Sequence, residues 1–488
     1  MTEFELKLEI PVARLDEVAA EVASEPVQRV RLRALYLDTP DQALARHGVA
    51  LRLRLEGDRW VQTAKGPGSG PVERLEHNVP LPDSAAATPA ADPGRHDGTP
   101  LSPRIREALG CPAGDAFPPL QVTFETDVER TLRDVREGAS VLELALDQGR
   151  LLAAGRSHVV RELEVELKDG DPADAVQLAR RWAGRHGLWL SATSKAQRGR
   201  LLAAGQVTGA PVGADPVACD PDAGSGEFVA AVLASCLAQV IGNASEIAAG
   251  SNADDHVHQL RVGIRRLRTA LRELQALAPL DAGAEPALVD AFRALGAHRD
   301  WTHVTRLVAP QLLAAGGPPL ETAPHAPALA EPGEVVRAPA FQDALFDLLA
   351  QQVRVGRQPG KPRKALRRAL QRLWRQVTRE GERFTELDEP LQHRVRKRLK
   401  RLRYLAEFSQ PLFTTRRVQA FVRELKPVQD ALGLNNDEAI ALAAWRRLAQ
   451  DDPKALFGAG WLSARRAPLA RAGGKALRRL SRVKPFWR

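Results

Sequence analysis

The chain has 488 residues, of which 44% are hydrophobic and three are cysteines, and its formal net charge is +10. A chain of this length predicts about two to four domains, and Cys111, Cys219 and Cys236 lack the spacing of a metal site or a disulfide framework. The N-terminus shows no signal peptide and no run of about 18 apolar residues follows. We therefore expect no membrane span and a cytoplasmic location.

The charge is distributed unevenly along the chain. Residues 1–200 hold 27 basic and 31 acidic residues, a net charge of −4, which leaves +14 for the remainder. Such asymmetry predicts two separate tasks, one of them on a polyanion. Nucleic acid, a membrane surface and inorganic polyphosphate are all polyanions of this kind.

Strand patterns dominate the first 200 residues. Alternating segments rich in Val, Leu, Phe and Trp are typical of strands, and they lie at 3–10, 29–38, 49–56, 59–65, 72–80, 120–130, 141–147 and 158–168. Helical spacing interrupts them at 12–24, 102–109 and 172–186, and residues 81–100 form a predicted long loop. This order indicates an α+β domain with a mainly antiparallel sheet.

The second half of the chain has a different pattern. Residues 205–226 are rich in Gly, Pro and Ala without any period, which predicts a linker. Helical spacing then covers 227–275, 286–313, 340–380, 389–409, 415–432 and 436–450, with a second predicted loop at 314–339. We predict a first domain at 1–204, an all-α domain at 227–450 and a basic tail at 451–488, in which 465–488 is a flexible arm.

Charged residues of one parity lie together on several predicted strands. Alternate side chains of a strand point to opposite faces, and the same-face sets are Glu3, Glu5 and Lys7; Arg52 and Arg54; Glu143 and Asp147; and Glu162, Glu164, Glu166 and Lys168. Lys65 and Arg130 lie at the ends of two further strands. A solvated face explains any one strand alone, whereas a closed sheet with its charges inside explains all of them together. Buried carboxylates and cations in one barrel then indicate a hard divalent cation and phosphate oxygens as ligands.

Eight ordered segments within residues 1–204 resemble the CYTH family, the triphosphate tunnel metalloenzymes. They are EFELK at 3–7, YLDTPD at 36–41, LRLR at 51–54, TAKGPG at 63–68, FETDVERT at 124–131, LELALDQG at 142–149, ELEVELK at 162–168 and SKAQRG at 194–199. The resemblance implies an eight-stranded antiparallel β-tunnel barrel with flanking helices. It also implies that the tunnel binds a triphosphate with Mg²⁺ or Mn²⁺.

Site residues follow from this resemblance position by position. It implies metal ligation by Glu3, Glu5, Glu162 and Glu164. It implies phosphate binding by Lys7, Arg52, Arg54, Lys65, Arg130, Lys195 and Arg198. The expected reaction is hydrolysis of a terminal phosphoanhydride, with Glu162, Glu164 and Lys7 as catalytic residues and a glutamate of the 162–166 strand positioning the water. Asp147 is left open between a site role and a structural turn.

A basic motif occurs twice in the helical half. VHQLRVGIRRLR begins at Val257 and QHRVRKRLKRLR begins at Gln392, and each carries a histidine followed by basic residues at +3, +7, +8 and +10. On a helix these offsets form one stripe, whose members are His258, Arg261, Arg265, Arg266, Arg268, His393, Arg396, Lys400, Arg401 and Arg403. A solvated basic face remains the alternative explanation, although like charges repeated at this spacing destabilise a helix that binds no anion.

Residues 225–450 resemble the CHAD family, through VHQLRVGIRRLR, LGAHRD, HRVRKRLKRLRYLAEF and VQDALGLNND. The resemblance implies two pseudo-repeated helical bundles that bind inorganic polyphosphate through this basic stripe and associate with polyphosphate granules. The leading prediction is therefore an inorganic triphosphatase tunnel tethered to a polyphosphate-binding domain, with tripolyphosphate and polyphosphate as partners. The alternatives are thiamine triphosphatase or adenylate cyclase activity, or a non-catalytic granule-binding protein. Nucleic acid is disfavoured because aromatics are scarce in the basic stretch, and the sequence does not indicate an oligomeric state.

Overall fold

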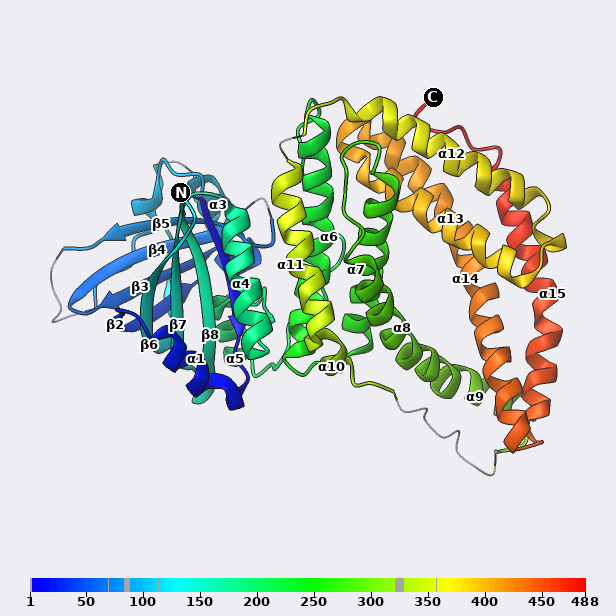
Figure 1. Ribbon diagram of the computed structural model, residues 1–488, viewed down its shortest axis with the longest axis horizontal. Coiled ribbons are helices and arrows are strands. Elements are labelled where there is room, and N and C mark those ends of the chain that lie inside the picture. The colour runs from blue at the N-terminus through cyan, green and yellow to red at the C-terminus, as the bar shows by residue number, and fades with distance from the viewer. Residues whose placement is uncertain (1, 69, 83–87, 113, 321–328, 357) are drawn as a thin grey trace. The chain divides into compact units, whose positions relative to one another are not determined.

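A computed structural model describes residues 2–68, 70–82, 88–112, 114–320, 329–356 and 358–488. It divides into two compact units (Figure 1). Unit 1 comprises residues 1–213, 237–259 and 336–354, and unit 2 comprises 214–236, 260–335 and 355–488. Parts of both predicted loops, at 83–87 and 321–328, lie outside the described residues.

Unit 1 is built around a closed antiparallel barrel (Figure 1). Its strands are β1 (Thr2–Glu9), β2 (Gln28–Asp38), β3 (Ala50–Glu56), β4 (Arg59–Pro67), β5 (Glu73–Pro80), β6 (Gln121–Glu137), β7 (Ser140–Ala153) and β8 (Arg156–Asp169). They follow the order β5-β4-β3-β2-β6-β7-β8-β1, and pairing of β1 with β5 closes the ring. A two-residue strand, β9 (Trp189–Leu190), adds to β1. The predicted eight-stranded tunnel is confirmed.

Strand alternation explains why the outer face is apolar on the strands that helices cover. On β1, Phe4, Leu6 and Leu8 are buried on the face opposite the charged residues. Helix α4 (Pro172–His186) contacts β1 and β8, and α2 (Ala43–Arg46) and α3 (Ser102–Leu109) share an apolar cluster with β3 and β4. Because helices cover the apolar outer face of these strands, their charged face is left for the interior. The outer faces of β2 and β6 are exposed and carry charged residues such as Arg29 and Glu129.

Helix α1 follows β1 in the sequence, and helix α5 follows β9. The predicted helix at 12–24 forms as α1 (Leu15–Val22) after a single 3₁₀ turn. Helix α5 (Lys195–Ala203) follows β9 and was not predicted as an element. Ser194 caps α5 by accepting a hydrogen bond from the Gln197 backbone nitrogen at 3.2 Å, which is a typical start signal for a helix.

The second half of the chain is helical, as predicted. Its helices are α6 (Ser225–Ala248), α7 (Asp254–Glu273), α8 (Glu285–Thr302), α9 (Ala309–Ala314), α10 (Pro332–Arg337), α11 (Pro339–Val355), α12 (Pro362–Glu382), α13 (Glu389–Phe408), α14 (Thr415–Asp451) and α15 (Ala455–Leu480). The expected flexible arm is wrong for most of its length, because α15 packs against α14 through Leu462, Trp445 and neighbouring apolar residues. The segment that follows also packs, with Trp487 against Phe421 and Trp374.

Helix α6 differs from the expectation that no segment could span a membrane. Among the described residues it is the one helix that is long and apolar enough to do so by length and composition, with a mean hydropathy of 1.7 over its apolar window. Of that window, 72% is buried against the rest of the protein. The interior helix of a globular domain meets the same two criteria, so this feature is weak support for a membrane span.

Candidate active site and anion-binding surface

The inward side chains of the barrel line one cavity of about 800 Å³. The ladder places opposite charges beside one another, with Lys7 opposite Glu164 and Lys65 opposite Glu76. Among the predicted site residues, the cavity is lined by Glu3, Glu5, Lys7, Arg52, Arg54, Lys65, Arg130, Glu143, Glu164 and Lys195. Residues 160 positions apart in the sequence therefore share one polar interior.

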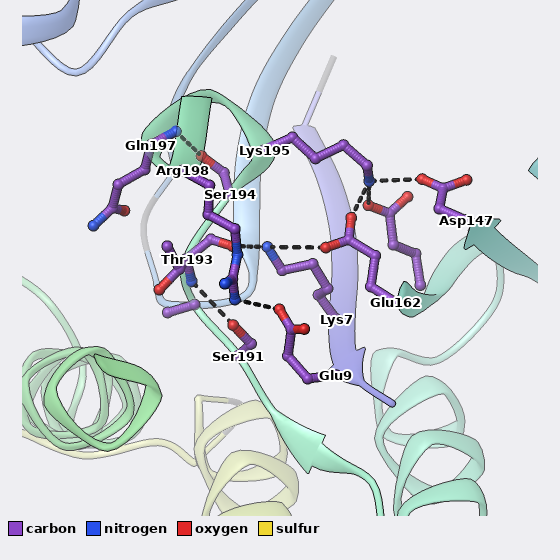
Figure 2. Close-up of polar contacts among 12 residues, drawn as sticks. Lys7, Glu9, Asp147, Glu162, Ser191, Thr193, Ser194, Lys195, Gln197 and Arg198 are labelled. Atoms are coloured by element: carbon purple, nitrogen blue, oxygen red, sulfur yellow. Dashed lines mark hydrogen bonds and ion pairs between the residues drawn. The ribbon is translucent and has the colours of Figure 1, made fainter. Parts of the chain in front are cut away.

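Lys195 lies at the centre of a carboxylate cluster at the wall of the cavity (Figure 2). Its ammonium nitrogen is 2.6 Å from Asp147 Oδ2 and 2.9 Å from Glu164 Oε1, and it also contacts Glu162. Arg130 donates to both Asp147 oxygens at 2.7 Å and to Glu164 at 2.5 Å. Oxygens of the three carboxylates lie within 4.8 Å of one another, so the two cations balance a concentrated negative charge.

The members of this cluster titrate differently. Burial opposes ionisation of Glu164, but Lys195 and Arg130 outweigh it and hold the Glu164 pKa well below its usual range. Asp147 behaves in the same way, and Arg130 and Lys195 lower its pKa despite burial. Burial dominates at Glu162 and raises its pKa to about 7, against Lys195 and Lys7. Two charged carboxylates thus lie beside one that exchanges a proton near neutral pH.

Lys7, which lines the cavity, and Arg198, which is not among the lining residues, lie beside this cluster (Figure 2). Lys7 is buried, donates to the Thr193 carbonyl and lies 3.8 Å from Glu162 Oε2. Burial lowers the pKa of Lys7, which Glu162 partly offsets. Arg198 pairs with Glu9, the next inward residue of β1, so its guanidinium is already neutralised by a carboxylate.

A second acidic group faces the open cavity. Lys65 donates to Glu3 Oε2 at 3.3 Å and pairs with Glu76, which is buried. Burial opposes ionisation of Glu76, but Lys65 and Arg52 outweigh it and lower its pKa to about 2. Burial raises the pKa of Glu3 to about 7, and burial together with the charge of Glu164 raises that of Glu5. In the part of the chain that the structure describes, no hydrogen bond or ion pair reaches the Glu5 carboxylate.

Two arginines of β3 complete the cationic side. Arg52 donates to the Tyr36 hydroxyl at 3.3 Å, and Tyr36 stacks on Phe124 with ring centroids 4.3 Å apart. Arg54 donates to Glu56 at 2.6 Å. Burial, followed by repulsion from Arg52, lowers the pKa of Arg54 to about 10. Two guanidinium groups held close together in this way suit an anion with several oxygens.

The carboxylates present fit a hard divalent cation, since Mg²⁺ and Mn²⁺ prefer oxygen ligands. The cluster of Asp147, Glu162 and Glu164 is already balanced by Lys195 and Arg130. Within the described residues no cation pairs with Glu5, and Glu3 pairs with Lys65 alone at 3.3 Å, while burial raises the pKa of both carboxyl groups. A bound cation stabilises the charged form of such groups, so Glu3 and Glu5, with Glu164 beside them, would hold it best.

The basic stripe of α7 is partly engaged within the protein. Arg261 and Arg265 lie over the Phe292 ring, at 4.4 and 5.6 Å from its centroid. Arg268 donates to Glu285 at 2.8 Å. Arg266 is only 2% exposed and lies over Phe408, so the expectation that it contacts a surface ligand is wrong. The offset of +8 does not by itself explain this burial, because Arg401 has the same offset in α13 and its side chain is 23% exposed.

Helix α13 presents the second copy of the stripe. His393 Nδ1 is 2.8 Å from Asn436 Oδ1, and Arg396 is 4.0 Å from Asp437. Arg403 donates to Glu407 at 2.6 Å. Arg401 shares the buried Glu273 of α7 with Arg372 of α12, at 3.0 and 2.6 Å. Lys400 is half-buried, and Glu273 joins three helices through two guanidinium groups.

Comparison with known families assigns both halves. The family model of the CYTH domain matches residues 1–199 and that of the CHAD domain matches residues 231–446. The chain is a CYTH–CHAD protein. The matched ranges lie within the predicted domains at 1–204 and 227–450, whose exact boundaries remain predictions.

Individual relatives match one part of this CYTH–CHAD protein each. An inorganic triphosphatase of Haemophilus influenzae is 31% identical over 212 residues, which are 42% of this chain and 56% of that protein. A CHAD domain structure from Ricinus communis is 26% identical, covering 57% of this chain and 98% of that one, with a TM-score of 0.46. A Hippeastrum putative adenylyl cyclase, HpAC1, is 17% identical, covering 42% of this chain and 96% of that one, with a TM-score of 0.31.

The CYTH tunnel contains charged residues that were not assigned as site residues. The positive charges of Lys65 and Arg52 lower the pKa of Glu76, and Glu9 pairs with Arg198. Parity on β1 could have identified Glu9, because it continues the series Glu3, Glu5 and Lys7. Glu76 is less visible in the sequence, since ERLEHNV at 73–79 shows no clear alternation. The sequence leaves Asp147 open between a site role and a structural turn. In the structure it is 1% exposed and pairs with Arg130 and Lys195.

Proposed function

We propose that the CYTH tunnel hydrolyses inorganic triphosphate or short polyphosphate with Mg²⁺ or Mn²⁺. The observation that carries this proposal is the unbalanced Glu5 carboxylate in a cavity that also presents Arg52, Arg54, Lys65 and Arg130. One wall suits a cation and the other suits phosphate oxygens. The Haemophilus relative, named an inorganic triphosphatase, supports the same substrate class.

The residues of the tunnel divide the chemistry among them. Arg52, Arg54, Lys65, Arg130 and Lys195 bind and orient the phosphate oxygens of the substrate. A divalent cation, when bound by Glu3 and Glu5, would neutralise phosphoryl charge during in-line attack by water. Glu164 remains ionised and accepts a hydrogen bond from the attacking water, so it orients that water.

Glu162 and Lys7 lie next to Glu164 and assist the attack by water. The raised pKa of Glu162, about 7, suits a group that accepts the proton released from water near neutral pH. Lys7 contacts Glu162 and keeps that side chain directed toward the cluster. Arg198 is assigned a supporting role through its pair with Glu9.

Phosphate release by the full chain tests the tunnel. The substrates are tripolyphosphate, long-chain polyphosphate, ATP and thiamine triphosphate, each with Mg²⁺, Mn²⁺ or EDTA. We expect metal-dependent release from tripolyphosphate that Glu5→Gln reduces by about 10²-fold or more, whereas Glu129→Gln, an exposed outward residue of β6, changes nothing. Faster phosphate release from thiamine triphosphate indicates thiamine triphosphatase activity, whereas adenylate cyclase activity converts ATP to cyclic AMP and pyrophosphate and is followed as pyrophosphate in the same reactions. Release of neither phosphate nor pyrophosphate from any substrate indicates a non-catalytic, granule-binding protein.

We also propose that the CHAD domain binds inorganic polyphosphate through the stripes of α7 and α13, in the cytoplasm and on polyphosphate granules. The half-buried residues His258, Arg261, Arg265, His393, Arg396 and Lys400 carry the contacts. Affinity for polyphosphate should fall with salt, and excess double-stranded DNA should compete poorly. Arg265→Ala combined with Lys400→Ala should weaken binding, while the exposed Arg416→Ala of α14 serves as the control. Equal competition by DNA would indicate a general polyanion site.

A further inference from the structure

The cavity of the CYTH tunnel reaches both edges of the barrel. In an antiparallel barrel the end of β2, the beginning of β3 and the end of β4 share one edge. The cavity is lined at this rear edge by Asp38, Gly48 and Pro67. It is also lined at the front edge by Glu56, which ends β3, and Lys168, near the end of β8. Space for a ligand therefore continues past the phosphate-binding residues in the middle.

Helix α5 covers only part of the rear edge. An apolar cluster of Tyr36, Phe124, Val128, Leu151 and Val160 packs against Ala196, Leu202 and Ala203 of α5. Gly199 brings the helix close, since a Cβ atom there would lie 2.1 Å from a ring atom of Phe124. The contact closes the side formed by β6, β7 and β8. The cavity continues on the other side, where Ala196, Gln197 and Arg200 of α5 and Ile241 of α6 line it.

Arg200 brings a positive charge to the rear part of the cavity without a counter-charge at contact distance. Within the described residues its guanidinium makes no ion pair and donates no hydrogen bond. Burial lowers the pKa of Arg200, and Asp38 is the acidic group that offsets this. Asp38 is engaged elsewhere, because its carboxylate accepts hydrogen bonds from the backbone nitrogens of Thr39, Leu44 and Ala45 at 2.8, 2.9 and 3.0 Å.

We propose that Arg200 binds a phosphate group of a linear polyphosphate chain that extends beyond three phosphates toward the rear edge. A guanidinium that lines a cavity without a carboxylate partner suits a phosphate oxygen. The inference rests on the proposed function, because it takes the middle of the tunnel as the triphosphate site. It makes Arg200 a determinant of chain length, and it names linear inorganic chains of four or more phosphates as the ligands of this subsite.

Steady-state kinetics of the full chain test the subsite. We compare kcat/KM for tripolyphosphate and tetrapolyphosphate with Mg²⁺ in the wild type, Arg200→Ala, Arg200→Lys and Arg29→Ala. Arg29 is an exposed, outward residue of β2 and is the matched control. We expect Arg200→Ala to lower the ratio of tetrapolyphosphate to tripolyphosphate kcat/KM about tenfold, as loss of one charged hydrogen bond would do. Arg200→Lys should recover part of that ratio.

Two kinetic results would overturn this inference. An equal loss on both substrates in Arg200→Ala would place Arg200 in the triphosphate site or in the fold. An unchanged ratio would show that no phosphate reaches it. If the wild type cleaves neither substrate, the proposed function fails. In that case calorimetric binding of tetrapolyphosphate to wild type and Arg200→Ala still decides the subsite, since equal affinities refute it and a weaker variant supports it.

Discussion

Lys195 is the side chain whose loss should disturb the tunnel most. It is in contact with Asp147, Glu162 and Glu164. Glu162 is 2% exposed, and the side chain of Glu164 is 13% exposed. Lys195→Met keeps the length of the side chain and removes its charge, which leaves buried carboxylates underbalanced. Breaking a buried charge network in this way destabilises a protein by about 3–5 kcal/mol.

Hydrogen exchange of the metal-free protein measures this effect locally, in peptides that cover β7 and β8. A loss of about 3–5 kcal/mol corresponds to exchange that is roughly 150- to 5,000-fold faster. The control is Lys168→Met, because Lys168 is 40% exposed and binds Glu143 and Glu166 at the front edge. An exposed pair of that kind contributes at most about 1 kcal/mol.

Addition of Mg²⁺ gives the variant a second signature. The three carboxylates lie within 4.8 Å of one another, so a divalent cation can replace the lost ammonium charge in Lys195→Met. We expect Mg²⁺ to slow exchange in Lys195→Met much more than in Lys168→Met. If both variants exchange at the same rate without metal, the cluster does not depend on Lys195 and the argument is wrong.

Three further predictions concern single residues. His96 is buried against His77, and burial followed by His77 lowers its pKa from 6.5 to about 4. The unfolded chain then binds the proton more readily than the folded protein does. The free energy of unfolding should therefore fall as the pH drops from 6.5 toward 4, by up to about 1.4 kcal/mol per pH unit. His96→Gln should flatten this pH dependence in thermal scans. Phe292→Ala should weaken polyphosphate affinity about three- to tenfold in titrations through lost cation–π contacts, whereas Phe457→Ala, on α15, should not. Glu273→Gln should lower the CHAD domain's unfolding free energy by about 1–3 kcal/mol in denaturant titrations, because two charged hydrogen bonds lose strength; an unchanged midpoint would contradict this.

The regular elements were predictable because their periods are strong. The predicted strands at 29–38 and 49–56 agree within a residue with β2 and β3, and the predicted helix at 172–186 has the bounds of α4. Charge parity also predicts the inward face of β1, β3 and β8, since a strand offers only two faces. The sequence does not predict the helix at 195–203, because it is short and only weakly amphipathic.

Pairing within the site was less predictable than its composition. The sequence places Lys195, Asp147 and Glu162 on three separate segments. Ladder register brings Asp147 opposite Glu162, and the packing of helix α5 brings Lys195 to both. The burial of Arg266 is similar, because the α7 repeat shows its charge but not the packing of Phe408 over it. Register and packing depend on partners far away in the chain, which periodicity alone does not reveal.

Closure of the barrel by β1 has a consequence for synthesis of the chain. The first strand pairs with β5 and β8, and Lys195 must follow before the carboxylate cluster is balanced. At about 5–20 residues per second, the nascent β1 waits roughly 10–40 seconds for its last partners. During this time its alternating charges face water on one side and oppose pairing with other nascent chains. We expect the acidic residues that bind ligands in the finished tunnel to protect the unfinished one from aggregation.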